Sequence, residues 1–447
     1  MDIKDLIVTP LVLILIILMA YILRPYFTNA QTKKFFISAL VFKMIGAISI
    51  GLIYQFYYDR GGDTFAYYNQ SKQIHAAFYE NPITGMKLLL NSGGNYYEIT
   101  DNDPDTYKYT SKMRFFKGKS EYFVIRLSAL FGLFCFHTYT SIALCFAVLS
   151  FISMWMAYKS FLRLYPNLRL GFAIAFLFIP STIIWGSGIF KDTIVLSAVA
   201  WAFISIIWLF EGKKKIVLSL TVLALALYVV FMVKLYVLFA LLPSLVLWMV
   251  LHYKNRITNP IVRISLAPIL ISIGMIFAYL SVESVAANDR RFSLDQIGER
   301  TRINAEYLYY MSNKSQGSGY YLGTMDGSIS SMLTLTPAAI NVTLFRPYIW
   351  EVKNPLMLLS SLESVFFIIL TLSVFFRPGL TKAFKTATKD EVIIVFFVFT
   401  FILSAAVGLN SYNFGTLSRY KIALLPFYIA GLFILRNSIN LPKRRLS

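Results

Sequence analysis

The chain has 447 residues, of which 57% are hydrophobic and 14% charged, and its formal net charge is +20. This composition excludes an ordinary soluble domain, and runs of about 17–25 mostly apolar residues recur along the sequence as they do in polytopic membrane proteins. The basic residues fall largely in short loops between the apolar runs, so they indicate membrane topology and not a nucleic-acid partner.

Eleven apolar runs predict membrane-spanning helices, and together they predict an all-α bundle that forms a single transmembrane domain over residues 1–436. The first run has no small-residue cleavage site after it, so we interpret it as a retained span and not as a signal peptide. The apolar stretch 122–137 carries Arg126, and we place it as an interfacial or re-entrant helix. The eleven predicted spans are 6–23, 35–57, 139–158, 170–187, 193–210, 216–233, 236–252, 262–281, 357–376, 392–409 and 419–435.

The basic loops predict the orientation of the bundle. Lysine and arginine concentrate after the first, third, fifth, seventh, ninth and eleventh spans, which places these loops on one side. The positive-inside rule makes that side the cytoplasm, with the amino terminus outside and the short basic tail 437–447 inside. The opposite face carries two long loops, 58–121 and 282–356. Because long loops commonly carry function, we expect the working face to point outward.

Asp63 is the first candidate site residue. It follows the second predicted span in the stretch Gly61-Gly62-Asp63-Thr64-Phe65-Ala66-Tyr67-Tyr68. Glycines allow a sharp turn and a close approach to a ligand, and the carboxylate can act as a general base on a sugar or lipid hydroxyl. Tyr67 and Tyr68 are candidate substrate contacts, although aromatic residues at this depth also anchor helices in the membrane surface. The structural alternative for Asp63 is the N-cap of the following helix.

Four cations lie beside the predicted outer ends of helices: Lys191, Arg346, Arg419 and Lys421. Helix amino termini favour anions, so a cation beside them suits a phosphate between the two. The phosphate of a lipid-linked donor would be such a partner, and arginine can bind it in a bidentate manner. Contact with lipid headgroups is the alternative for all four. Lys191 could also pair with its neighbour Asp192, which is itself a candidate substrate-binding residue.

The sequence indicates no metal-binding cluster and no cofactor, and it leaves metal dependence open. The three histidines are scattered, and Cys135 and Cys145 lie in apolar stretches, so neither a zinc site nor a disulfide framework is indicated. Asp101, Asp103 and Asp105 alternate as in a calcium loop, but the glycine and glutamate that such a loop needs are missing. We interpret this segment as a solvated loop.

Two further groups of charges remain. Arginines and tyrosines recur over 289–321 in the second long loop, where they suit either sugar and phosphate binding or an exposed amphipathic helix. Lys43 and Glu363 fall inside predicted spans. Charges at that depth commonly pair within a bundle, and structural pairing is the expectation for both.

The chain resembles the GT-C-type integral membrane glycosyltransferases, which use polyprenyl-phosphate-linked sugars. The acidic motif near the membrane is Gly62-Asp63-Thr64-Phe65-Ala66-Tyr67, and the stretches 180–192, 344–351 and 415–421 are similar to segments of uncharacterised bacterial relatives. The resemblance implies Asp63 as the catalytic base and Arg419 and Arg346 as donor-phosphate ligands. In this chain the acidic loop follows the second span, whereas in many members it follows the first.

The leading hypothesis is an inverting glycosyltransferase of the bacterial inner membrane with an outward active face. It would move a sugar from an outer-leaflet polyprenyl-phosphate donor to an envelope glycan or lipid acceptor, with membrane lipids as its surroundings. A polysaccharide or O-antigen polymerase that joins lipid-linked repeat units is the alternative enzyme, favoured by the arginine-rich second loop. A transporter or flippase of a lipid-linked glycan is the alternative outside the enzymes, and it would more typically show repeats and polar groups at the midplane.

Overall fold

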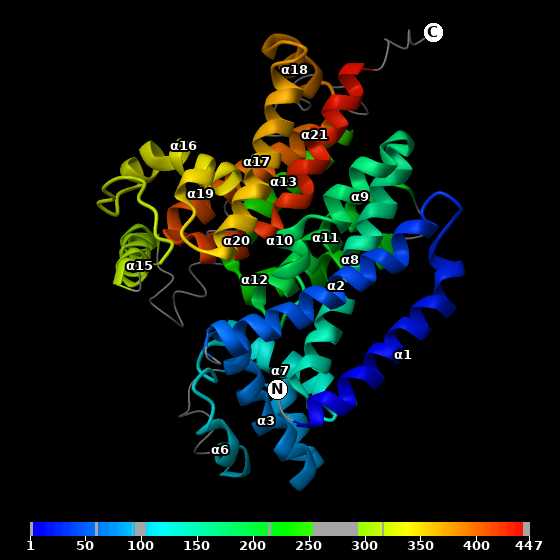
Figure 1. Ribbon diagram of the computed structural model, residues 1–447, viewed down its shortest axis with the longest axis vertical. Helices are drawn as coiled ribbons and strands as arrows, with labels where there is room; N and C mark the ends of the chain where they lie inside the picture. Colours follow the sequence, from blue (N-terminus) through cyan, green and yellow to red (C-terminus); the bar gives the residue numbers. More distant parts are fainter. Residues whose placement is uncertain are drawn as a thin grey trace. The chain divides into compact units, whose positions relative to one another are not determined.

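The computed structural model describes residues 3–58, 61–91, 93, 104–212, 216–253, 294–314 and 317–440. Throughout these segments the regular structure is helical, and the single β-type pairing is an isolated bridge between Gly319 and Asn413. Figure 1 labels these helices. The chain forms two compact units. Unit 1 comprises Met1–Phe161 and Thr182–Leu235, and unit 2 comprises Leu162–Ser181 and Tyr236–Ser447.

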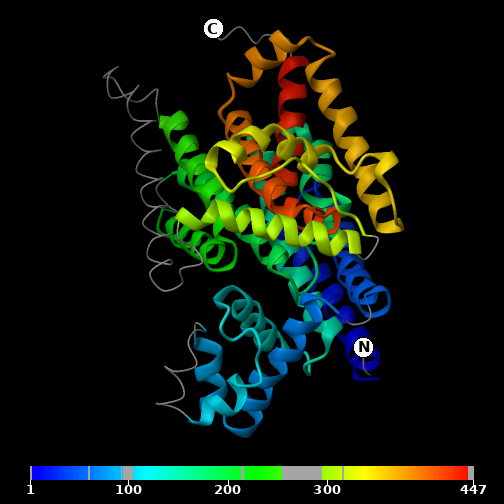
Figure 2. The same cartoon turned by 90° about the vertical axis from the view of Figure 1, so that its left-hand side faces the viewer.

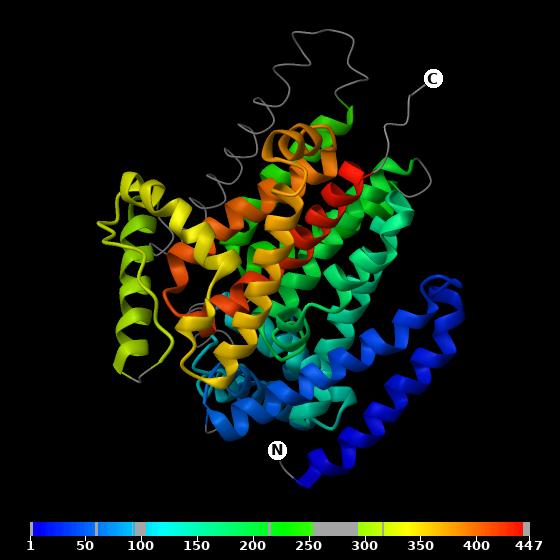
Figure 3. The same ribbon diagram turned by 45° about the horizontal axis from the view of Figure 1, so that its top comes forward.

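Unit 1 begins with a hairpin of two long helices, α1 (Ile3–Phe27) and α2 (Lys33–Leu52) (Figure 3). The second of them continues into a π-helical turn, η1, before the chain leaves the apolar segment. The helices of this unit are α1 (Ile3–Phe27), α2 (Lys33–Leu52), η1 (Ile53–Tyr57), α3 (Asp63–Glu80), α4 (Pro82–Leu90), α6 (Pro104–Thr110), α7 (Lys119–Phe134), α8 (Tyr139–Leu164), α11 (Lys191–Phe210) and α12 (Ile216–Val233).

The core of unit 1 follows from helical spacing. Buried residues of α2 recur every three or four positions from Phe36 to Ile50, which is the stripe of a helix with one face against its neighbours. Phe36 packs edge-on against Phe151 and Trp155 of α8, with ring centroids 5.2 and 4.8 Å apart. α11 is buried along nearly its whole length and lies against α12, while α3 lies against α7.

In unit 2, α19 packs against α16 on one side and α21 on another. Gly408 allows the first contact, because a Cβ at this position would lie 2.3 Å from the carbonyl oxygen of Ala339. α15 runs across the direction of α21 (Figure 2). The helices here are α9 (Arg169–Leu177), α13 (Leu235–Tyr253), α15 (Leu294–Lys314), α16 (Ile329–Phe345), α17 (Pro355–Phe375), α18 (Leu380–Ala387), α19 (Glu391–Ser411), α20 (Phe414–Tyr420) and α21 (Leu425–Asn440), with short 3₁₀ turns at Pro166–Leu168, Ile349–Glu351 and Lys421–Ala423.

Eight helices among the described residues are long and apolar enough to cross a membrane, as expected for a polytopic membrane protein. They are α1, α2 with η1, α8, α11, α12, α13, α17 and α19, and each coincides with a predicted span. A ninth crossing is formed if Phe414–Ala423 and Leu425–Asn440, which bend by 61°, count as one span. This bent pair covers the predicted span 419–435 but begins earlier. The predicted span 262–281 lies outside the described residues.

One expectation about a spanning helix is wrong. The predicted span 170–187 is broken, because α9 ends at Leu177 and the five-residue helix α10 (Pro180–Ile184) starts only after Phe178 and Ile179. Pro180 lacks a backbone N–H and disfavours helical backbone at Ile179, the residue before it, and this explains the break. The second predicted loop, 282–356, also contains the apolar helix α16, whose first turn is capped by the Ser328 hydroxyl. The stretch predicted as interfacial, 122–137, falls largely in the 16-residue helix α7.

Candidate functional site

Asp63 is the first residue of α3, and the backbone around it is tightly constrained. Gly62, at the N-cap position, has φ +85°, a conformation that favours glycine. A Cβ at Gly62 would lie 2.5 Å from Cε1 of Tyr54, in the π-helical turn that ends the second span. Such π-helical turns often occur at functional sites. The glycine turn is therefore confirmed, whereas the N-cap is Gly62 and not Asp63. The Asp63 side chain is half-buried at the positive end of the α3 dipole.

The residues that follow Asp63 pack into unit 1. Tyr67 and Tyr68 are buried; Tyr67 contacts the Phe115 ring, and the Tyr68 hydroxyl donates to the carbonyl oxygen of His137 at 3.0 Å. Thr64, also buried, shares a hydrogen bond of 2.8 Å with the hydroxyl of Tyr139. The structure thus gives both predicted substrate-binding tyrosines a packing role, and a substrate role for them remains a prediction.

Behind α3 lies a histidine pair that the sequence analysis missed. His137 Nε2 is 3.0 Å from the Ser71 hydroxyl, and the His75 and His137 rings are 4.6 Å apart. Burial lowers the pKa of His137 to about 4, helped by the nearby His75, so its imidazole is neutral at pH 7. Ser71 is fully buried, so this hydroxyl does not face a substrate. No spacing pattern in the sequence predicts this pair, because His75 belongs to α3 and His137 to the turn before α8.

Lys191 and Asp192 are neighbours in sequence, but they pair with different partners. The Lys191 ammonium lies 2.6 Å from Glu121 of α7 and also donates to the Ser120 hydroxyl at 2.9 Å. Burial opposes ionisation of Glu121, yet the Lys191 charge holds the pKa of this carboxyl below its usual range. Asp192 is buried and accepts from the Lys234 ammonium at 2.5 Å. The alternative of a Lys191–Asp192 pair is therefore wrong.

In unit 2, Arg346 lies between a carboxylate and aromatic rings. Its Nε is 3.0 Å from both carboxylate oxygens of Glu351, and a second guanidinium nitrogen also bonds to Glu351. The guanidinium carbon is 5.4–5.8 Å from the ring centres of Tyr320, Tyr348 and Phe414. Although burial opposes it, the Arg346 hydrogen bonds lower the pKa of Glu351. A phosphate on Arg346 would have to share the guanidinium with Glu351.

Lys421 contacts the backbone of Arg346. It is fully buried, and its ammonium is 3.5 Å from the carbonyl oxygen of Arg346. It also interacts electrostatically with the buried Glu363, which accepts hydrogen bonds from the backbone N–H and hydroxyl of Ser181 at 2.8 and 2.7 Å. The structure thus brings Arg346 and Lys421 together. Arg419 lies half-buried in α20.

Lys43, the other predicted intramembrane charge, is held by neutral groups. Its ammonium donates to the Ser150 hydroxyl at 2.8 Å and to the carbonyl oxygens of Thr182 and Gly186 at 2.7 and 3.0 Å. These bonds tie α2 to α8, to Thr182 of α10 and to the turn before α11, and all of these residues belong to unit 1. Glu363 is therefore held by the two hydrogen bonds from Ser181 and attracted electrostatically by Lys421, and Lys43 is held by hydroxyl and carbonyl dipoles. Both charges thus have structural partners within their own unit.

The predicted site residues divide between the two units. Unit 1 holds Asp63, Tyr67, Tyr68, Lys191 and Asp192, and unit 2 holds Arg346, Arg419 and Lys421. Across the described segments no group of three His, Cys, Asp or Glu side chains could hold a metal ion; Asp101 and Asp103 lie outside those segments. No family model, curated protein or solved structure matches this chain.

Proposed function

We propose that this chain is a membrane glycosyltransferase that moves a sugar from a polyprenyl-phosphate donor to an envelope glycan or lipid acceptor. The observation that carries the proposal is the placement of Asp63. It is a half-buried carboxylate on the first turn of a helix, preceded by a glycine with φ +85° that lies five residues after a helix of spanning length. A general base for a lipid-linked substrate needs such a rigid position close to the membrane surface.

In the proposed reaction Asp63 takes the proton of the acceptor hydroxyl. The acceptor oxygen then bonds to the anomeric carbon of the donor sugar while the bond from that carbon to the phosphate oxygen breaks, and the electron pair leaves with the phosphate. Attack opposite the leaving group inverts the configuration. Taken within unit 2 alone, Arg346 can bind a phosphate group, because its planar guanidinium matches phosphate oxygens in pairs and would share them with the Glu351 carboxylate.

The outward orientation of this chemistry, in a bacterial inner membrane, rests on the distribution of basic loops. In the predicted scheme of eleven spans, which counts 170–187 as one crossing, the loops after alternate spans carry the lysines and arginines, and the positive-inside rule assigns these loops to the cytoplasm. The segment that holds Asp63 then faces outward, where lipid-linked sugars are used for envelope assembly. A reporter fused before Asp2 that responds as cytoplasmic would contradict this orientation.

Mass spectrometry of lipid-linked and envelope glycans tests the function. Cells would carry the native chain, no chain, Asp63→Asn, or the control Asp105→Asn, which removes an exposed carboxylate from the same predicted outer segment. Loss of a general base typically costs about 10²–10⁴ in rate. We expect Asp63→Asn cells to show the same truncated glycan as the deletion strain at normal protein level, and Asp105→Asn cells to resemble the native strain. Native glycans in Asp63→Asn cells would refute the role of Asp63 and favour the transporter.

The polymerase remains the second candidate because of α15. This 21-residue helix is polar and exposes the rings of Tyr307 and Tyr310. Such rings can pack on sugar faces, as a long glycan would require. Arg302 is held by Glu299 and Glu306 on the same helix, so it contributes less to phosphate binding than its charge suggests. Accumulation of single lipid-linked repeat units in Asp63→Asn cells would favour the polymerase.

A further inference from the structure

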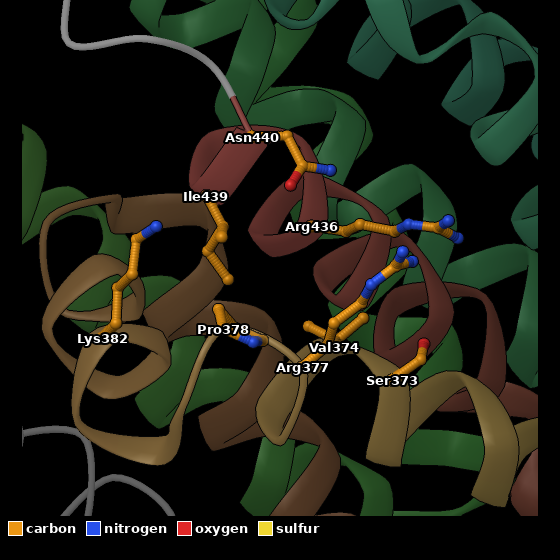
Figure 4. A pocket seen from close by; sticks show the side chains of 8 residues that line it. All are labelled: Ser373, Val374, Arg377, Pro378, Lys382, Arg436, Ile439 and Asn440. Carbon is orange, nitrogen blue, oxygen red and sulfur yellow. The ribbon is translucent and has the colours of Figure 1, made fainter.

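A pocket opens in unit 2 where the carboxyl-terminal ends of α17 and α21 meet α18 (Figure 4). Its volume is about 350 Å³, at the lower end of the range for small-molecule sites. We call it the basic pocket. Its lining residues are Ser373, Val374, Arg377, Pro378, Lys382, Arg436, Ile439 and Asn440.

Three cations from three different segments line this pocket, and no acidic residue does. Arg377 follows α17, Lys382 belongs to α18, and Arg436 belongs to α21. Their side chains are exposed, and within the part of the chain that the structure describes none of the three forms a side-chain hydrogen bond or an ion pair. Three like charges around one cavity repel each other, so the arrangement favours an anion between them.

The nearest acidic residues in the sequence are already engaged. Asp390 accepts from the Tyr165 hydroxyl at 2.8 Å and caps the first turn of α19. Glu391 accepts from the Trp248 indole at 3.4 Å and lies 3.0 Å from Nδ1 of His252. Both carboxylates therefore have other partners and do not neutralise the charges of the basic pocket.

The surroundings of the basic pocket match a membrane surface. The pocket lies at the ends of α17 and α21, which are apolar helices, and its lining includes Val374, Pro378 and Ile439 besides the cations. Next to it, α18 exposes Leu380 and Phe384 together with its lysines, as a helix does that lies in the membrane interface. Basic pockets between membrane helices bind the headgroups of anionic lipids.

We propose that the basic pocket binds a phosphate ester, supplied by the headgroup of an anionic membrane lipid. Arg377 and Arg436 would hold the phosphate oxygens, with Lys382 as the third charge, while the apolar lining receives the adjoining glycerol and acyl carbons. The site is separate from the Arg346–Glu351 pair, which precedes the other end of α17. That helix has 21 residues and a length of about 31 Å. The inference does not depend on the proposed function.

Native mass spectrometry of the purified full-length chain tests this site. The protein would be titrated with phosphatidylglycerol, with phosphatidylcholine and with inorganic phosphate. The pocket variant is Arg377→Gln/Arg436→Gln. The matched control is Lys385→Gln/Lys389→Gln, which removes the same charge from a neighbouring segment that does not line the pocket. We expect the native chain and the control to bind phosphatidylglycerol at least tenfold more tightly than phosphatidylcholine, and the pocket variant to lose this preference.

Three outcomes would overturn the proposal. Unchanged binding of phosphatidylglycerol by the pocket variant would refute the site. An equal loss in the control would show general attraction to positive charge. Binding of inorganic phosphate that needs the two arginines, without a preference between the lipids, would assign the pocket to a soluble phosphate compound. If the double variant does not fold, Lys382→Gln replaces it on an exposed position, and we expect it to weaken binding of phosphatidylglycerol about threefold; native affinity in that variant would equally refute the site.

Discussion

The buried ion pair between Asp192 and Lys234 offers the sharpest test of how unit 1 is held together. The two side chains are 2% and 8% exposed, and their charged atoms are 2.5 Å apart. The pair joins the first turn of α11 to the residue between α12 and α13. The substitution Asp192→Asn keeps the size of the side chain and removes its charge, so the buried Lys234 loses the ion pair with Asp192.

The expected cost follows from this burial. Breaking a buried pair from one side typically destabilises a protein by about 3–5 kcal/mol. Coulomb's law supports this size, since two unit charges about 4 Å apart attract by about 4 kcal/mol at an effective dielectric constant of 20. Replacing both partners together, as Asp192→Leu/Lys234→Met, removes both buried charges, and we expect most of the loss to be recovered.

Denaturant unfolding of the purified chain in detergent measures these differences. Glu121→Gln is the matched control, because it breaks the Lys191–Glu121 pair, whose side chains are 18% and 29% exposed. We expect it to cost about 1 kcal/mol, since exposure to water weakens ion pairs. The reasoning is refuted if Asp192→Asn is as stable as the native chain. A stable variant that has lost substrate binding would restore Asp192 to the predicted substrate site.

Three further changes test other contacts. Gly62→Ala should cost more stability than the control Gly379→Ala, because both glycines have φ near +85° but only Gly62 faces a ring, and equal losses in unfolding titrations would contradict the close approach of Tyr54. The folded pKa of His137, about 4, is below the unfolded value of about 6.5. The unfolded chain therefore binds more protons as the pH falls through this window, and stability should drop by about 3 kcal/mol between pH 6.5 and 4. His137→Gln should remove most of this drop in the same titrations, and an unchanged pH profile would refute the assignment. The sulfur atoms of Cys135 and Cys145 are 3.6 Å apart, so mild oxidation should block both from a maleimide reagent; full labelling after oxidation would contradict their proximity.

The sequence by itself determined the class of this protein and most of its long helices. A segment in lipid must satisfy its own backbone hydrogen bonds, so about 20 consecutive apolar residues leave the helix as the one simple solution. Local chemistry was equally readable at Gly62, where the Gly-Gly-Asp sequence indicated a turn and the structure has a left-handed glycine. Ser328 before the apolar segment 329–345 is a typical N-cap residue and indicates a helix start, and the structure has α16 there. The prediction nevertheless assigned this segment to a loop.

Only the tertiary structure decided which charges meet. Lys191 pairs with Glu121, which is 70 residues away in the sequence, and Asp192 pairs with Lys234, which is 42 residues away. Lys191 and Asp192 are adjacent in the sequence but do not pair with each other. Hydropathy and local spacing report whether a segment is buried, but not which remote segment covers it. The histidine pair behind α3 and the three cations of the basic pocket depend on the same packing. These groups form only where packing brings together helices that are distant in the chain, because packing and not sequence distance determines which side chains are neighbours.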